Sequence, residues 1–183
     1  MGKPRVSRNR YVRDYRLVET VDSRGRIRTD YEYIAETYVF LKSDREVRRA
    51  KRRVWLCCAL GWIGCIGAML PESNAMRTLW IALPFVFSIL PLALLTGMAL
   101  QDLRAAQPFE HRWADRLENR YPACTFLLTA LAALAFLLGG IGALVRQALT
   151  KGDIAFLAGA GTLAICACVC FRQRGSFGTR KNG

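Results

Sequence analysis

Charged residues are missing from four long stretches of this 183-residue sequence. None of the stretches contains Asp, Glu, Lys, Arg or His, and they are 18, 23, 23 and 18 residues long. About 20 apolar residues in a helix cross a hydrocarbon core of about 30 Å. A buried helix of a soluble bundle would show a polar stripe facing water, and no such stripe is present. The stretches are residues 54–71, 78–100, 123–145 and 154–171.

Several functional signatures are also absent. The sequence has no glycine-rich phosphate loop, HExxH motif, nucleophile elbow or CxxC pair, and His111 is its only histidine. The apolar stretches hold no ionisable group of the kind that ion-coupled transporters bury. We therefore expect no cofactor, no enzymatic activity and no secondary active transport by the single chain. We also expect no cleavable secretory signal, because the first apolar stretch begins only at Val54.

These patterns predict an all-α integral membrane protein. Residues 54–171 would form a four-helix transmembrane bundle, preceded by a basic N-terminal segment, residues 1–53, and followed by a basic tail, residues 172–183. The first and fourth stretches are short for a span, so three spans plus a re-entrant segment is the alternative architecture.

The distribution of Lys and Arg predicts the orientation. The N-terminal segment, residues 101–122 and the tail carry 16, 4 and 4 of them, whereas residues 72–77 and 146–153 carry 1 and 2. Basic residues in short flanks stay on the cytoplasmic side, so we expect a multi-pass protein of the cell membrane with both termini in the cytoplasm. Topology and anionic lipid head groups then account for the net charge of +13, and we expect no nucleic-acid partner.

The N-terminal segment contains a strand-like pattern. Apolar and polar residues alternate between Arg26 and Phe40, a second candidate strand covers residues 15–21, and the sequence DSRG at Asp22–Gly25 is a turn signal. We predict a cytoplasmic β-hairpin at about residues 15–40. Because an isolated hairpin is marginally stable, we expect it to be stabilised by contact with the bilayer, a second copy or a partner. The alternative is a partly ordered arm without a partner.

A helix is predicted to begin at residue 44 and to run into the first span. Ser43 and Glu46 have the spacing of a capping box, and a cluster of basic residues follows immediately before Val54. These side chains would contact lipid phosphates or a partner: Arg48, Arg49, Lys51, Arg52 and Arg53.

The segment between the second and third stretches predicts a short helix lying in the membrane interface. Aromatic and apolar residues recur every four positions from Phe109 to Tyr121, beside a parallel row of arginines. His111 and Asp115 would share a helix face, which allows a partial metal site or acid–base pair, although solvated charges are the simpler interpretation. The candidate contacts with lipid or a partner are Arg112, Trp113, Arg116 and Arg120.

The apolar stretches carry small residues at helical spacing, which predicts close helix packing or self-association. Six of the seven cysteines would lie in the cytoplasmic half of the membrane, where packing is a simpler role than metal binding, acylation or oxidation. The small residues are Gly61, Gly64, Ala68, Ala135, Gly139, Ala143, Ala155 and Gly159; the polar residues available to a pore are Ser88, Thr96, Thr125 and Thr129.

The sequence therefore favours a non-enzymatic accessory or scaffolding subunit. It would dock anionic lipid or a protein partner, including a second copy, at the cytoplasmic face. Two alternatives remain: an oligomeric channel or exporter component, and a membrane-embedded enzyme that uses the 101–122 loop.

Overall fold

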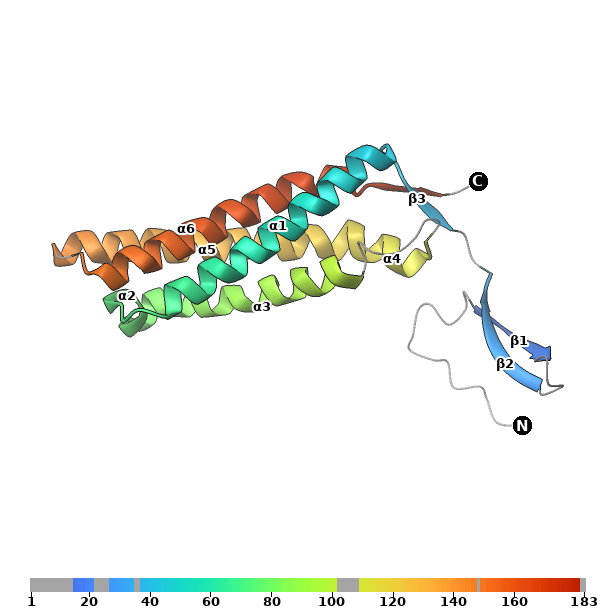
Figure 1. Ribbon diagram of the computed structural model, residues 1–183, viewed down its shortest axis with the longest axis horizontal. Helices are drawn as coiled ribbons and strands as arrows, with labels where there is room; N and C mark the ends of the chain where they lie inside the picture. The colour runs from blue at the N-terminus through green and yellow to red at the C-terminus, as the bar shows by residue number, and fades with distance from the viewer. Residues whose placement is uncertain (1–14, 22–26, 35–36, 102–108, 148, 182–183) are drawn as a thin grey trace.

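The computed structural model describes all of the chain except residues 1–14, 22–26, 35–36, 102–108, 148 and 182–183. In this described part, four helices are long and apolar enough to cross a membrane, and they run side by side (Figure 1). This confirms the four predicted helices and indicates a multi-pass membrane protein. The helices are α1 (Asp44–Met69), α3 (Leu79–Gln101), α5 (Tyr121–Arg146) and α6 (Lys151–Arg172).

Shorter elements lie at the two ends of the bundle (Figure 1). At one end are α2 (Asn74–Arg77) and the N-terminus of α6. At the other are α4 (His111–Asp115), the π-helical turn η2 (Arg116–Arg120) and the 3-10 turn η3 (Gln173–Ser176). Two antiparallel pairs of strands lie at this second end: β1 (Tyr15–Val21) with β2 (Ile27–Tyr33), and β3 (Tyr38–Phe40) with β4 (Thr179–Lys181).

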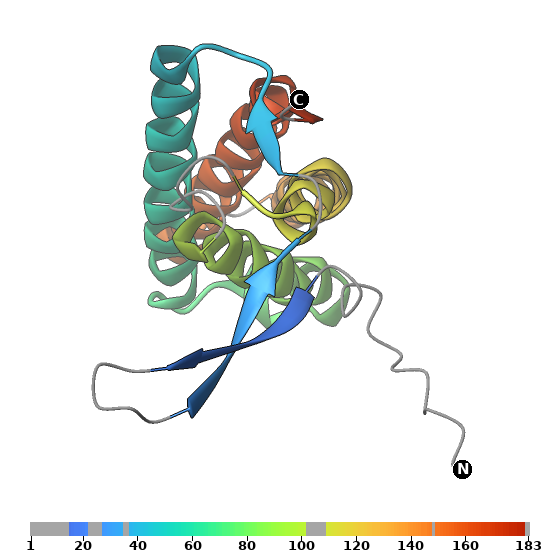
Figure 2. The same ribbon diagram turned by 90° about the vertical axis from the view of Figure 1, so that its right-hand side faces the viewer.

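The four long helices pack in the order α1, α6, α5, α3 around the bundle (Figure 2). The contact between α1 and α3 that closes this ring is the least extensive of the four. Aromatic side chains fill the interior: the rings of Phe85 on α3 and Phe156 on α6 have centroids 5.1 Å apart, and both side chains are fully buried.

Small residues set the closest approach in the bundle, where α1 crosses α6. A Cβ atom added at Gly159 would overlap the backbone carbonyl of Gly64 and lie 2.7 Å from Cβ of Ala68. A Cβ atom at Gly64 would in turn lie 3.0 Å from the carbonyl oxygen of Gly159. The predicted small-residue ridges on the first and fourth stretches therefore do pack two helices of one chain together.

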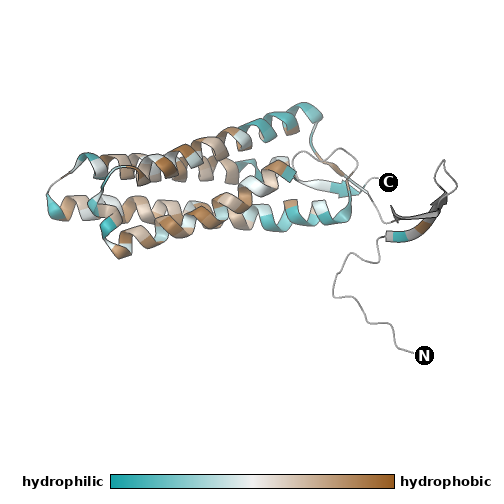
Figure 3. Cartoon of the chain, turned by 60° about the horizontal axis from the view of Figure 1, so that its bottom comes forward, coloured by the Kyte–Doolittle hydropathy of each residue, from teal (hydrophilic) through white to brown (hydrophobic). Residues whose placement is uncertain are grey.

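Hydrophobic residues predominate along the central part of the long helices, and hydrophilic residues gather toward the ends of the bundle (Figure 3). Large apolar side chains are exposed on every long helix, for example Leu56, Trp80, Phe87, Leu137 and Ile165. This apolar surface is far larger than the exposed apolar patches of soluble monomeric proteins. It fits contact with lipid.

The prediction of a single hairpin over residues 15–40 is wrong at its C-terminal side. The hairpin ends at Tyr33, with Tyr15 opposite Tyr33 and Val21 opposite Ile27, and its predicted turn at Asp22–Gly25 lies outside the described residues. Phe40 belongs instead to β3 and pairs with Thr179 of the C-terminal tail. The alternating pattern continues through both strands, so it did not reveal that β3 has a distant partner.

The predicted interfacial helix between the second and third spans is also wrong for the described residues. Residues 111–146 form one nearly continuous helical stretch, because α4, η2 and α5 follow one another without a break. The side chains that were expected to face lipid are packed within the protein: Phe109, Leu117 and Tyr121 are buried. Pro122 does not interrupt this stretch, because it lies in the first turn of α5, directly after η2, where a missing N–H donor is tolerated.

Helix α1 confirms the predicted continuous rod from the basic cluster into the first apolar stretch. Ser43 holds the N-cap position, but its hydroxyl donates to the Glu46 carboxylate at 3.1 Å rather than capping a backbone N–H. One face of α1 is buried along its whole length, through Val47, Ala50, Val54, Cys58, Gly61, Cys65 and Ala68.

At the opposite end, a buried carboxylate fastens the α1–α3 connection to α6. Asp153 accepts hydrogen bonds from the backbone N–H of Ala75 at 3.1 Å, the hydroxyl of Thr150 at 2.8 Å and the amide of Asn74 at 3.5 Å. Thr150 and Asp153 also form a full capping box at the start of α6. Asp153 therefore has all of its main partners within the protein, which is typical of a structural role.

Replacing Asp153 by alanine is expected to lower the free energy of unfolding by about 2 kcal/mol or more, because buried donors lose a charged acceptor. For a chain of this size, that corresponds to a fall in Tm of about 4–8 °C, measurable by thermal unfolding in detergent. Asp153→Asn keeps an acceptor oxygen and should lose less.

Glu72→Ala is the matched control, since Glu72 pairs with Arg77 at 2.7 Å on the exposed surface, where ion pairs contribute about 0–1 kcal/mol. Equal Tm values for the Asp153→Ala and Glu72→Ala proteins would contradict this role of Asp153.

Candidate functional site

The end of the bundle at which β3 and β4 lie is called the basic end. Here α1 exposes Arg48, Arg49, Arg52 and Arg53, four of the residues predicted to contact lipid or a partner. Lys51 differs: it is partly buried, and its Nζ atom lies 5.2 Å from the centroid of the Phe40 ring. Beyond this cluster the exposed residues of α1 become apolar, beginning with Leu56. The basic cluster thus adjoins the apolar surface of the same helix.

A second basic group lies on α4 and η2. The guanidinium carbons of Arg112 and Arg116 lie 5.4 and 5.5 Å from the ring of Trp113, within the range of cation–π contacts. Arg120 is exposed one turn further along. The structure does not merge the two predicted groups into one site, because α1 and the α4–η2–α5 helix lie on different sides of α6 (Figure 2).

An aromatic cluster joins distant parts of the chain at the basic end. Phe40 of β3 lies 5.0 Å from Phe109 and 6.3 Å from Phe177, and Tyr121 lies 5.2 Å from Phe177, measured between ring centroids. All four side chains are buried. The hydroxyl of Tyr121 donates to the carbonyl of Cys170 at 2.9 Å, so the cluster is fastened to the last helix.

Backbone hydrogen bonds reinforce the same cluster. Tyr38 and Phe109 exchange two N–H···O bonds of 2.8 and 3.0 Å, and the N–H of Leu41 donates to Gly178 at 2.9 Å. The hydroxyl of Thr179 donates to the Glu118 carboxylate. One ordered base is therefore formed by β3, residues 109–121 and residues 177–181. Sequence reasoning missed this base because its contacts are between residues far apart in the chain.

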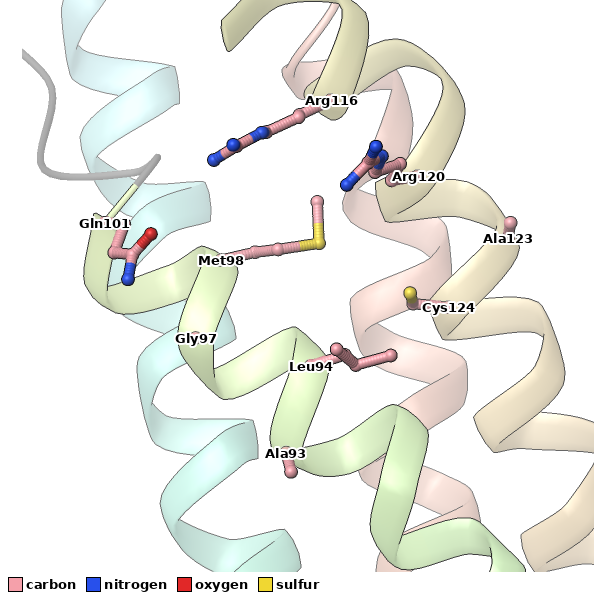
Figure 4. A pocket seen from close by; sticks show the side chains of 9 residues that line it. All are labelled: Ala93, Leu94, Gly97, Met98, Gln101, Arg116, Arg120, Ala123 and Cys124. Atoms are coloured by element: carbon pink, nitrogen blue, oxygen red, sulfur yellow. The ribbon is translucent and has the colours of Figure 1, made fainter. Parts of the chain in front are cut away.

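A groove with a cavity of about 460 Å³ lies between α3 and the η2–α5 region. Figure 4 shows Arg116 and Arg120 extending across one end of it, above Met98, with Leu94 and Cys124 further down. The sequence predicted the two arginines but not their apolar neighbours on α3. No sequence motif identifies those neighbours, because which residues of α3 face the groove depends on how the helix is rotated about its axis.

The only histidine of the sequence, His111, lies against β3. The ring of His111 stacks on Tyr38, with centroids 5.3 Å apart and an angle of 28° between the planes. Among the described residues there is no group of three His, Cys, Asp or Glu side chains that could hold a metal ion. All seven cysteines are described and free, and Cys58, Cys65, Cys166 and Cys170 are buried.

The hydroxyl residues considered for a pore make hydrogen bonds within their own helices. Ser88 donates to Phe85, Thr96 to Leu92, and Thr129 to Thr125, over 2.5–2.8 Å. Ser88 and Thr125 are fully buried inside a single chain, and Thr96 also accepts from the indole N–H of Trp62 at 3.0 Å. Because the interior already uses these groups, they do not favour a pore.

Comparison with known proteins gives no match to a family model, to a curated protein or to a solved structure.

Proposed function

We propose that this protein is a non-enzymatic membrane scaffold whose basic end faces the cytoplasm. It would bind anionic lipid head groups there and present an ordered surface to a partner protein or a second copy. The observation that carries the proposal is the exposure of four arginines on α1 immediately before its exposed surface turns apolar. That sequence of surfaces matches the passage from head groups into hydrocarbon.

The geometry of α1 indicates that these arginines are available to contact lipid and do not pack inside the bundle. The inward face of the helix is occupied by Val47, Ala50 and Val54, while Arg48, Arg49 and their neighbours project outward. Each basic residue near an anionic surface contributes about 1 kcal/mol of attraction. Long arginine side chains can reach phosphates while their methylene groups remain along the apolar surface.

The ordered base supports the docking part of the proposal. The β3–β4 pair and the aromatic cluster fix the point at which the chain leaves the bundle toward the β1–β2 hairpin (Figure 1). A two-stranded sheet offers free backbone edges, and adding a strand to such an edge is a common mode of peptide recognition. The hairpin is thus the surface through which we expect a protein partner to bind.

Charge removal on α1 tests the lipid part. The combined variant carries Arg48→Gln, Arg49→Gln, Arg52→Gln and Arg53→Gln. Its ratio of bound phosphatidylglycerol to bound phosphatidylcholine should be at least about fivefold lower than that of the wild type, because each arginine contributes about 1 kcal/mol near the surface. Native mass spectrometry of the detergent-solubilised protein with both lipids measures this ratio.

The control is Arg146→Gln with Lys151→Gln, which removes two exposed positive charges at the opposite end; the α1 pair Arg52→Gln with Arg53→Gln, which removes the same charge, is compared with it directly. An unchanged ratio in the α1 variant, or an equal fall in the control, would contradict the proposal. Protease protection of epitope tags at both termini of the wild type, in sealed membrane vesicles rather than in detergent, tests the orientation. Tags protected within right-side-out vesicles are expected, and external tags would refute the cytoplasmic assignment.

A further inference from the structure

The groove between α3 and α5 combines two kinds of surface. Arg116 and Arg120 form one end of it, and the remaining wall is mostly apolar, through Leu94, Met98 and Ala123 (Figure 4). A cavity of about 460 Å³ lies within the range of small-molecule sites, about 300–1,000 Å³. Two guanidinium groups above an apolar channel complement a ligand with an anionic head and a hydrocarbon chain.

The groove opens on the outside of the bundle, where lipid would lie. Leu94 is 53% exposed, and Ala93 and Ala123 on the two facing helices are also exposed. A ligand could therefore enter sideways from the bilayer without the helices separating. The arginines lie at the level of the polar ends of the helices, since Arg120 immediately precedes α5 and Gln101 is the last residue of α3.

We propose that this groove binds one anionic glycerophospholipid from the leaflet at the basic end. Arg116 and Arg120 would hold its phosphate, and one acyl chain would lie along Leu94, Met98 and Ala123. The inference rests on the proposed function and deepens it, because it names a defined site in addition to the general attraction of the α1 arginines. The apolar wall selects a lipid over a free phosphate, to which it offers no favourable contact.

Gly97 provides a way to block the acyl chain without changing any charge. It lines the groove, and a Cβ atom added to it would meet no atom within 4 Å. The first side-chain carbon of a leucine at this position therefore meets no neighbouring atom, and the rest of the side chain would take up space in the groove. Gly140 on α5 is the matched control, because its added Cβ also meets nothing within 4 Å and it is not a lining residue of this groove.

The experiment measures binding of phosphatidylglycerol to delipidated protein by native mass spectrometry. Gly97→Leu is expected to weaken the tightest binding step at least about fivefold, equal to about 1 kcal/mol, whereas Gly140→Leu binds like the wild type. Arg120→Gln is expected to weaken the same step about fivefold, and Arg116→Gln with Arg120→Gln further still. Millimolar inorganic phosphate should not displace the lipid, and phosphatidylcholine should bind more weakly than phosphatidylglycerol.

Wild-type binding by both Gly97→Leu and Arg120→Gln would overturn the site. So would equal losses in Gly97→Leu and Gly140→Leu, or displacement of the lipid by inorganic phosphate, which would indicate a site for soluble anions. If Gly97→Leu lowers the Tm, the exposed Arg120→Gln substitution decides. The α1 arginine variant separates the two proposals. If that variant loses the preference for phosphatidylglycerol and the groove variants keep it, the lipid site in the groove is refuted, while the proposed function of the α1 arginines still holds.

Discussion

Leucine in place of Gly159 is expected to force α1 away from α6 and to unfold the bundle at a lower temperature. Even one added carbon would overlap the Gly64 carbonyl and crowd Cβ of Ala68 at 2.7 Å. These atoms belong to a helix backbone and its first side-chain carbon, so neither can rotate aside. Overpacking of this kind costs about 3 kcal/mol, and the Tm should fall by about 6–12 °C.

Thermal unfolding of the purified protein in detergent measures this effect, with Gly67→Leu as the control. Gly67 lies on the same helix as Gly64, but a Cβ atom added to it meets nothing within 4 Å. The control should melt within about 1 °C of the wild type, as expected for a surface change. If Gly159→Leu melts like Gly67→Leu, the described α1–α6 crossing does not hold the bundle together.

Removing the ring of Phe177 is expected to release the C-terminal tail. Phe177 is 1% exposed and contacts the rings of Tyr121 and Phe40. It lies beyond the fourth apolar stretch, where water would replace the ring, so Phe177→Ala should cost about 3–5 kcal/mol. The loss should appear as faster tryptic cleavage at Arg180 and Lys181, which belong to β4.

Phe87→Ala is the matched control for this variant, since Phe87 is 59% exposed on the outer face of α3. Its removal should leave the cleavage rate at Arg180 unchanged. Cleavage of the Phe177→Ala tail at the wild-type rate would show that the β3–β4 hydrogen bonds alone secure the tail and that the aromatic cluster is dispensable.

The long helices could be predicted because their signal is local. For α3, α5 and α6, the run without charged residues gives both ends of the helix to within a few residues, as for residues 78–100 and α3 (Leu79–Gln101). The continuous α1 rod was likewise visible from Ser43 and the basic residues that lead directly into Val54. The small residues Gly64 and Gly159 marked a close contact, although the pairing of their helices required the structure.

The basic end was harder to predict because its contacts join residues far apart in the chain. Nothing near Phe40 shows that its partner strand begins at Thr179. The predicted helix face is present at Leu117 and Tyr121, whereas Phe109 precedes α4 and forms a bridge with Tyr38. That face was assigned to lipid, whereas it packs against protein, because periodicity gives the face of a helix but not what covers it.

The candidate lipid groove illustrates the same limit. Arg116 and Arg120 were identified from their spacing and charge. Leu94 and Met98 were not, because the middle of α3 is apolar around its whole circumference, and the sequence does not indicate which side turns toward α5. When a site lies between two helices, the sequence identifies only its polar residues and not the apolar residues that the other helix contributes.

The pairing of β3 with β4 also fixes an order of events during biosynthesis. Residues 38–40 leave the ribosome before the first apolar stretch, and residues 179–181 leave it after the last. β3 must therefore wait until every span has been synthesised before its partner strand exists. Chains that stop short of Phe177 would contain all four apolar stretches and yet lack the strand that β3 pairs with, so this end of the bundle could not form as it does in the structure.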